Sequence, residues 1–147
     1  MAMQKTTIGI VAVVAVISLM VSALGALVAT HTISNSGTLT AVGVGVYSDN
    51  GCTTVLSSIG WGSLNPGDVK TFTMYVRNEG NVPETLNIAE DNWNPAPASS
   101  YITLTWNQEN QVLPVGQVVQ AVLTLTVSSS VSDVTSFNFD VTITGTQ

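Results

Sequence analysis

The sequence predicts an all-β protein, an immunoglobulin-like (jelly-roll-like) antiparallel β-sandwich preceded by an N-terminal hydrophobic helix. Three observations support this prediction. A long apolar run ends at Ala29. Apolar and polar residues then alternate with a period of two, the pattern of strands that bury one face. Clusters of Gly, Pro, Asn, Asp and Ser interrupt the alternation, as turns do.

The N-terminal segment 1–29 runs apolar from Ile8 to Ala29, after the single cation Lys5. At about 1.5 Å per residue the run spans roughly 33 Å, close to the ~30 Å hydrocarbon core of a bilayer. A cation before the run and none after it orients the N-terminus toward the cytoplasm. We therefore expect an exported, cell-surface or extracellular protein that meets the membrane only through residues 8–29.

Three fates of this run stay open. Small residues before Thr30 fit a signal peptidase site with Ala29 as the last residue removed, although the run is long for an export signal. A retained membrane anchor is the second fate. The third is a type IV pilin-like helix, trimmed near Gly9 and kept as a filament core, although the separation of Lys5 from Gly9 fits that processing poorly.

The segment 30–37 is uncharged, extended in character and free of proline. It is either a flexible linker or the first strand of the domain itself. Its residues are Thr30, His31, Thr32, Ile33, Ser34, Asn35, Ser36 and Gly37.

The sandwich domain occupies residues 38–147, and nothing in it has the 3.6-residue period of a helix. The Gly-Val-Gly run at 43–45 predicts a bulge or a close backbone approach. About seven strands are expected, the number typical of an immunoglobulin-like sandwich. They lie near 38–47, 53–60, 69–77, 82–89, 101–107, 117–128 and 136–145.

Composition excludes several functions. Three basic residues face nine acidic ones, and so few cations cannot neutralise a nucleic-acid backbone. The single histidine, His31, and the single cysteine, Cys52, supply neither a nucleophile–base pair nor a zinc site. We expect no enzyme and no cofactor. Acidic turns at 48–50 and 90–92 could offer oxygens to calcium, but turn residues that bond their own backbone explain them equally well.

Three tryptophans are the large apolar anchors. Trp106 lies on the inward phase of its strand and is expected in the core. Trp61 and Trp93 lie at a strand end and in a Pro-rich loop, so they are candidates for exposed contacts at a subunit interface. The alternative is that they close the ends of the sandwich.

Short motifs in the first half of the domain resemble the TasA/camelysin family of exported fibre-forming proteins and its archaeal pilus-like relatives. The chain shows a Ser-Gly-Thr-Leu strand entry, a Leu-x-Pro-Gly-Asp turn and a strand that ends in Asn-x-Gly, in the family's order. The second half carries no matching motif, and the metal ligands of a protease are missing. The matching positions are Ser36, Gly37, Thr38, Leu39, Leu64, Pro66, Gly67, Asp68, Asn78 and Gly80.

The resemblance implies a structural subunit of an extracellular filament, a pilus or a biofilm-matrix fibre. In such fibres the N-terminal segment of one subunit completes the sandwich of the next, so 30–37 would be the donor strand and the partner another copy of the chain. Signal peptidase would be a partner only during export. Two alternatives remain: a type IV pilin-like subunit, and a monomeric, membrane-anchored immunoglobulin-like binding module.

Overall fold

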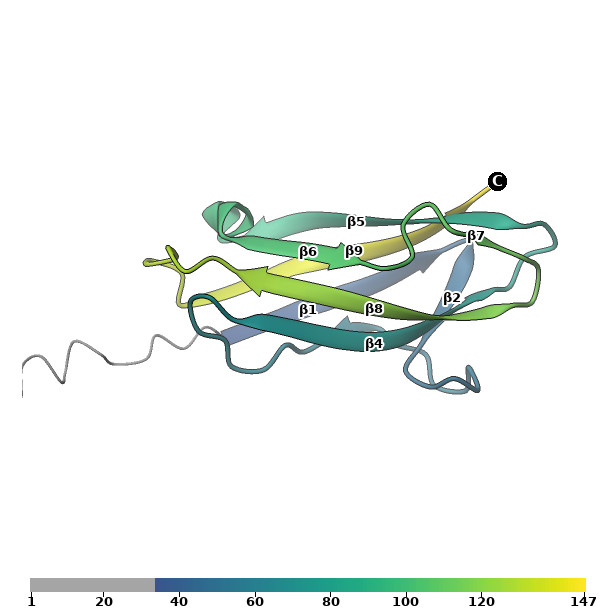
Figure 1. Ribbon diagram of the computed structural model, residues 1–147, viewed down its shortest axis with the longest axis horizontal. Coiled ribbons are helices and arrows are strands. Elements are labelled where there is room, and N and C mark those ends of the chain that lie inside the picture. The colour runs from purple at the N-terminus through teal and green to yellow at the C-terminus, as the bar shows by residue number, and fades with distance from the viewer. Residues whose placement is uncertain (1–33) are drawn as a thin grey trace, which may run out of the picture. The chain divides into compact units, whose positions relative to one another are not determined.

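The computed structural model describes residues 34–147, which form two β-sheets packed face to face (Figure 1). One sheet has the strand order β3-β1-β9-β5-β7, and the other has the order β2-β4-β8-β6. The elements are β1 (Ser34–Val42), β2 (Val44–Tyr47), β3 (Ser58–Ile59), β4 (Val69–Asn78), β5 (Glu84–Asn94), the 3-10 helix η1 (Ala96–Ser100), β6 (Ile102–Trp106), β7 (Val112–Leu113), β8 (Val118–Val127) and β9 (Ser136–Thr146). The architecture is a β-sandwich. The expected hydrophobic helix lies outside the described residues.

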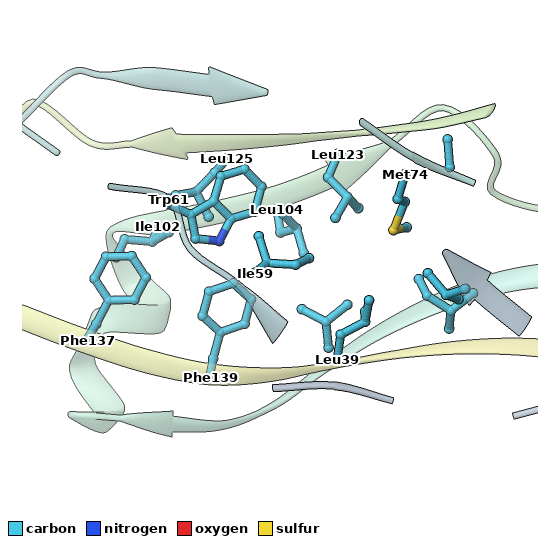
Figure 2. Packing of buried hydrophobic residues seen from close by; sticks show 14 of the residues in the cluster. Leu39, Ile59, Trp61, Met74, Ile102, Leu104, Leu123, Leu125, Phe137 and Phe139 are labelled. Carbon is cyan, nitrogen blue, oxygen red and sulfur yellow. The ribbon is translucent and has the colours of Figure 1, made fainter. Parts of the chain in front are cut away.

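The inward phase of each long strand supplies the core. Figure 2 shows Phe137 and Phe139 of β9 projecting toward Leu123 and Leu125 of β8 and Met74 of β4. All five side chains are buried. Because successive strand residues point to opposite faces, the period-two pattern is enough to sort the core from the surface. The predicted strands at 69–77, 101–107, 117–128 and 136–145 are confirmed by β4, β6, β8 and β9.

The segment expected as one strand over 38–47 is two strands in different sheets. The break is at Gly43, whose φ of 80° is favourable only for glycine. A Cβ at this position would also lie 2.6 Å from the carbonyl oxygen of Gly145. The chain leaves the five-stranded sheet as β1 and enters the four-stranded sheet as β2. The close backbone approach predicted for 43–45 is therefore confirmed at Gly43.

Other boundaries differ from the prediction because tertiary contacts decide them. The expected strand at 53–60 contributes only the two residues of β3. The expected strand at 82–89 continues to Asn94 as β5, through an irregularity between Asp91 and Asn94. Asn92 has a φ of 54°, a left-handed conformation that asparagine tolerates better than most residues. The elements β7 and η1 were not expected.

One strand pair corrects the expectation of a wholly antiparallel sandwich. The first strand, β1, pairs in parallel with the last, β9, in continuous register from Ser34 opposite Ser136 to Val42 opposite Thr144. The other strand pairs in the described residues are antiparallel. Alternation in the sequence reports which face of a strand is buried, not which distant strand lies beside it, so this pairing could not be predicted.

A buried asparagine joins β4 to the loops around it. Asn78 is 1% exposed. Its side-chain nitrogen donates to the carbonyl oxygens of Val82 (2.8 Å) and Leu113 (2.9 Å), and its side-chain oxygen accepts from the Gly80 N–H (2.9 Å). All three of these hydrogen bonds join the Asn78 side chain to backbone atoms. This explains why a polar residue is tolerated at the inward phase of the strand.

We expect Asn78→Ala to lower the free energy of unfolding by about 2–4 kcal/mol, because backbone groups that Asn78 pairs would be left unsatisfied in the interior. Chemical denaturation of the variant measures this. Asn138→Ala is the matched control: Asn138 is exposed on β9, and its loss should change stability by less than about 0.5 kcal/mol. Equal effects of the two substitutions would contradict the role assigned to Asn78.

Candidate functional site

The strand β1 carries the part of the predicted donor segment that the structure describes. Ser34, Asn35, Ser36 and Gly37 form its first half and pair with residues 136–139 of β9 in the same chain. Thr30, His31, Thr32 and Ile33 lie outside the described residues, as do Ile8 and Ala29. The sequence predicts a boundary between residues 37 and 38, but in the structure one strand, β1, continues across it to Val42.

Backbone contacts, more than side chains, hold β1 in place. Leu39 is the single buried hydrophobic residue of this strand among its described side chains, at 5% exposure. At Gly37 a Cβ would lie 3.2 Å from the carbonyl oxygen of Phe139, so the absence of a side chain lets the two backbones approach closely. Asn35 accepts from the Trp61 N–H (2.8 Å) and donates to the Gly62 carbonyl oxygen (2.6 Å). A strand of this kind adds little to the core but completes a sheet.

The outer side of β1 is only partly covered. The strand β3 pairs with Gly37 and Thr38, and the Leu39 N–H donates to the Ser57 carbonyl oxygen (2.9 Å). Beyond that point β1 and β2 diverge into different sheets. A groove of about 370 Å³ lies between them, lined in part by Leu39, Val46 and Leu56. The edge of β2 on this side is covered by residues 54–56, where the Leu56 N–H donates to the Val46 carbonyl oxygen (2.9 Å) and Val55 forms a bridge with Tyr47. The edge left open beside the apolar side chains of the groove is therefore that of β1 beyond Leu39, a short edge to which a strand could add.

The opposite side of the sandwich, where β5 and β6 are the neighbouring edges, is closed by carboxylates. Glu109 accepts from the Ile88 N–H (3.2 Å) and from the Trp106 ring nitrogen (2.5 Å). Glu90 of β5 accepts a hydrogen bond from the backbone N–H of Leu104 in β6. Charged groups directed at strand edges discourage pairing with other chains. The two long sides of the sandwich are thus covered by different groups: carboxylates on the β5 side, and β3 with the 54–57 segment on the β1 side.

The environment of Glu90 makes this closure sensitive to pH. Burial raises the pKa of Glu90, and hydrogen bonds from the Leu104 N–H and the Trp93 side chain partly oppose the rise. Raising the pKa in the folded state means that the fold favours the protonated form. The corresponding stability is present in full below the ordinary pKa of 4.5 and is lost as the pH rises through the higher, folded-state value.

The structure corrects the expectation that Trp61 is an exposed contact, whereas Trp93 keeps partial exposure. Trp61 is 6% exposed, and its ring meets that of Phe72 edge-on, with centroids 6.1 Å apart. Trp93 is half-buried and stacks on Phe139 at 4.1 Å, because the irregularity in β5 returns its ring to the inner face. The alternative given from the sequence, that these rings close the sandwich, describes both. Trp106 is half-buried and packs against the core.

Of the two expected acidic turns only 48–50 is a turn, and 90–92 lies in β5, because the strand continues to Asn94. Asp49 accepts from the Thr53 hydroxyl (2.8 Å) and the Thr54 N–H (2.8 Å), and hydrogen bonds from these two residues lower the pKa of Asp49. Asn92 donates to Asp140 (2.7 Å). Residues 34–147 contain no group of three His, Cys, Asp or Glu side chains placed to hold a metal ion.

Cys52 lies at the tip of the loop between β2 and β3. Its thiol is half-buried and unbridged, and burial raises the pKa of this thiol. His31 lies outside the described residues. Within the part of the chain that the structure describes, no helix is long and apolar enough to cross a membrane.

The motif positions at 64–68 and 78–80 have structural roles. Leu64 is fully buried, and Gly67 adopts a φ of 86°. Asp68 accepts from the Asn65 N–H (2.8 Å), which closes the turn that leads into β4. Asn78 and Gly80 are joined by the hydrogen bond described above. These residues shape turns of the sandwich, so they carry no chemistry of their own.

Sequence reasoning missed Glu84, a buried carboxylate beside the break between β1 and β2. The residue is 6% exposed, and its Oε2 has no hydrogen-bond partner within residues 34–147. A Cβ at Gly145 would lie 2.1 Å from this oxygen, and one at Gly43 would lie 3.3 Å from it. The glycines that make room for Glu84 are 43 and 145, which are far apart in sequence, so no local pattern could have identified the site.

Searches against protein-family profiles and against curated proteins give no significant match to this chain.

We expect Leu39→Ala to weaken the attachment of β1 and to lower the free energy of unfolding by about 2–4 kcal/mol, since Leu39 is the strand's one deeply buried anchor. Amide hydrogen exchange of residues 34–42 and chemical denaturation measure the effect. Val42→Ala is the control on the same strand, because Val42 is 51% exposed. If Val42→Ala is as costly as Leu39→Ala, the account of β1 is wrong.

We expect Glu90→Gln to stabilise the protein at pH 7 by less than about 1 kcal/mol, because the amide keeps an acceptor for Leu104 and removes the cost of a partly buried charge. Below pH 4.5 the carboxyl of the native protein is itself neutral, so the difference should vanish. Thermal unfolding across this pH range tests it. A stabilisation that grows as the pH falls would contradict the assignment.

Proposed function

We propose that this chain is a structural subunit of an extracellular surface filament, exported by its apolar N-terminal run and assembled head to tail by its N-terminal strand. The observation that carries the proposal is β1, a first strand bound mainly through its backbone to the last strand of the sandwich. The order of the motifs that resemble the TasA/camelysin family supports the same class.

Strand exchange follows naturally from such contacts. Each backbone hydrogen bond between β1 and β9 has the same geometry whether β1 comes from the same chain or from a neighbour. Exchange then requires a hinge, and Gly43 stands directly after the strand with a φ of 80°. The segment from Ser34 to Val42 forms one strand, which supports a donor longer than 30–37.

Exchange in one direction propagates. A subunit that donates its first strand to one neighbour and accepts a strand from another forms a heterologous contact, which extends into a filament unless two copies exchange reciprocally. The open groove beside β1 and the carboxylates that close the other side favour a single direction of addition. Seven strands of four residues or more support an immunoglobulin-like class for the sandwich.

A monomeric, membrane-anchored module is the second candidate, favoured by one observation. The pairing of β1 with β9 within a single chain already completes the sandwich. The two candidates differ in whether β1 of one copy ever lies on β9 of another, and this can be measured directly.

The test uses Thr40 and Thr142, which are register partners on the outer face of β1 and β9. In a Cys52→Ser background, Thr40→Cys is placed in one full-length chain and Thr142→Cys in another, and both are produced in the same cells. We expect a disulfide between the two chains in the filament fraction, because adjacent strands bring their Cα atoms within bridging distance.

Pairing Thr40→Cys with Thr124→Cys is the matched control, since Thr124 lies in the other sheet. Both substitutions in one chain show whether the intrachain pair forms. If only that chain is bridged and no filaments are seen by electron microscopy, the filament proposal is wrong and the anchored module is left. Mass spectrometry of the same material locates the mature N-terminus.

A further inference from the structure

The two outer faces of the sandwich differ in charge. The chain has nine acidic residues and a formal net charge of −6. On the five-stranded sheet, Asp91 and Asp140 are register partners in the outward phase of β5 and β9. Like charges directly opposite each other across two strands repel. A second acidic molecule approaching this face would add to that repulsion.

The outer face of the four-stranded sheet carries no carboxylate on its strands. Threonines occupy matching outward positions on three adjacent strands: Thr105 of β6 is opposite Thr124 of β8, and Thr124 is opposite Thr71 of β4. A second row places Thr103 opposite Thr126, and Thr126 opposite Val69. We call this surface the threonine face.

Charge is confined to one corner of the threonine face. Arg77 is exposed at the end of β4. Near it the Tyr47 hydroxyl donates a hydrogen bond to Glu79, which follows β4 and lies over Gly45. A basic and an acidic residue therefore occupy the same corner, and the remainder of the face is uncharged.

The face is not covered by another element of the described residues, and its area approaches that of a small stable contact. The helix η1 lies at one end of the described sandwich and does not cross this sheet (Figure 1). Strands stand about 4.8 Å apart and rise about 3.3 Å per residue, so two ten-residue strands with two shorter neighbours present roughly 500 Å² per copy. Two copies in full contact would bury about 900–1,000 Å², close to the lower bound for a specific interface.

We propose that the threonine face binds the threonine face of a second copy of this chain. The contact buries Thr methyl groups together with the side chains of Val69 and Val122. In this orientation two strongly acidic chains meet without placing the carboxylates of their sheet strands opposite each other. Because the face is remote from β1 in the sheet order, the contact forms whether or not β1 is exchanged. In a filament the contact would join two neighbouring rows of subunits side by side.

The test compares two double variants of the full-length chain in mild detergent. Thr71→Glu with Thr124→Glu places two charges on the threonine face, and Thr40→Glu with Thr142→Glu places two on the opposite outer face. Each pair consists of register partners on adjacent strands, so the number of added charges and their placement opposite each other are matched. Thermal unfolding confirms that both variants fold.

Sedimentation equilibrium gives the dissociation constant of the dimer. We expect the threonine-face variant to weaken it at least tenfold and the opposite-face variant to leave it within twofold. We also expect the native dimer to change little between low and high salt, since an uncharged contact is not screened. A native chain that stays monomeric, or two variants with equal effects, would overturn the inference.

Failure of this inference and failure of the filament proposal are distinguishable. Suppose that filaments contain the disulfide between Thr40→Cys and Thr142→Cys chains, but that charges on the threonine face do not weaken the dimer. This result supports strand exchange and overturns the face contact. A dimer that is lost only in the threonine-face variant, without any such disulfide, supports the face contact and contradicts strand exchange.

Discussion

The fold depends on the backbone pairing of β9 with strands on both of its sides. In the five-stranded sheet β9 lies between β1 and β5 and is bonded to both along most of its length. Its inward side chains, Phe137, Phe139, Val141 and Ile143, are among the most deeply buried in the molecule. The last strand of the described sandwich therefore organises the sheet, and the first strand is bound to it through contacts distant in sequence.

That constraint makes β1 and β9 contribute unequally to the fold. Removing β9 would remove a central strand and four core side chains, whereas removing β1 would remove an outer strand with one buried anchor, Leu39. Under the proposed strand exchange, β1 is therefore the strand whose replacement by that of another copy would disturb the core least. The extent to which strand edges are covered differs between the two sides of the sandwich. A groove lies beside β1, and the carboxylates of Glu90 and Glu109 bond the strand edges on the other side.

The outer faces of the two sheets differ in the charged residues that their strands carry. On the five-stranded sheet Asp91 and Asp140 face each other in the outward phase, whereas on the four-stranded sheet threonine supplies β propensity and a methyl group without charge. The strands of the chain thus place carboxylates on one outer face and none on the other, within a net charge of −6. If the proposed contact forms, this uneven placement favours approach through the face without strand carboxylates.

The sequence by itself determined the sandwich class, the four long alternating strands and the special backbone near Gly43, because burial of one face is written locally in every second residue. Turn residues such as Gly67 and Asp68 could be recognised for the same reason. Only the tertiary structure decided that β1 runs parallel to β9, that Trp61 and Trp93 turn inward, and that Glu84 is enclosed between glycines 43 and 145. Those features depend on which distant segments meet, and local alternation is the same for any partner strand, so no pattern along the chain specifies them.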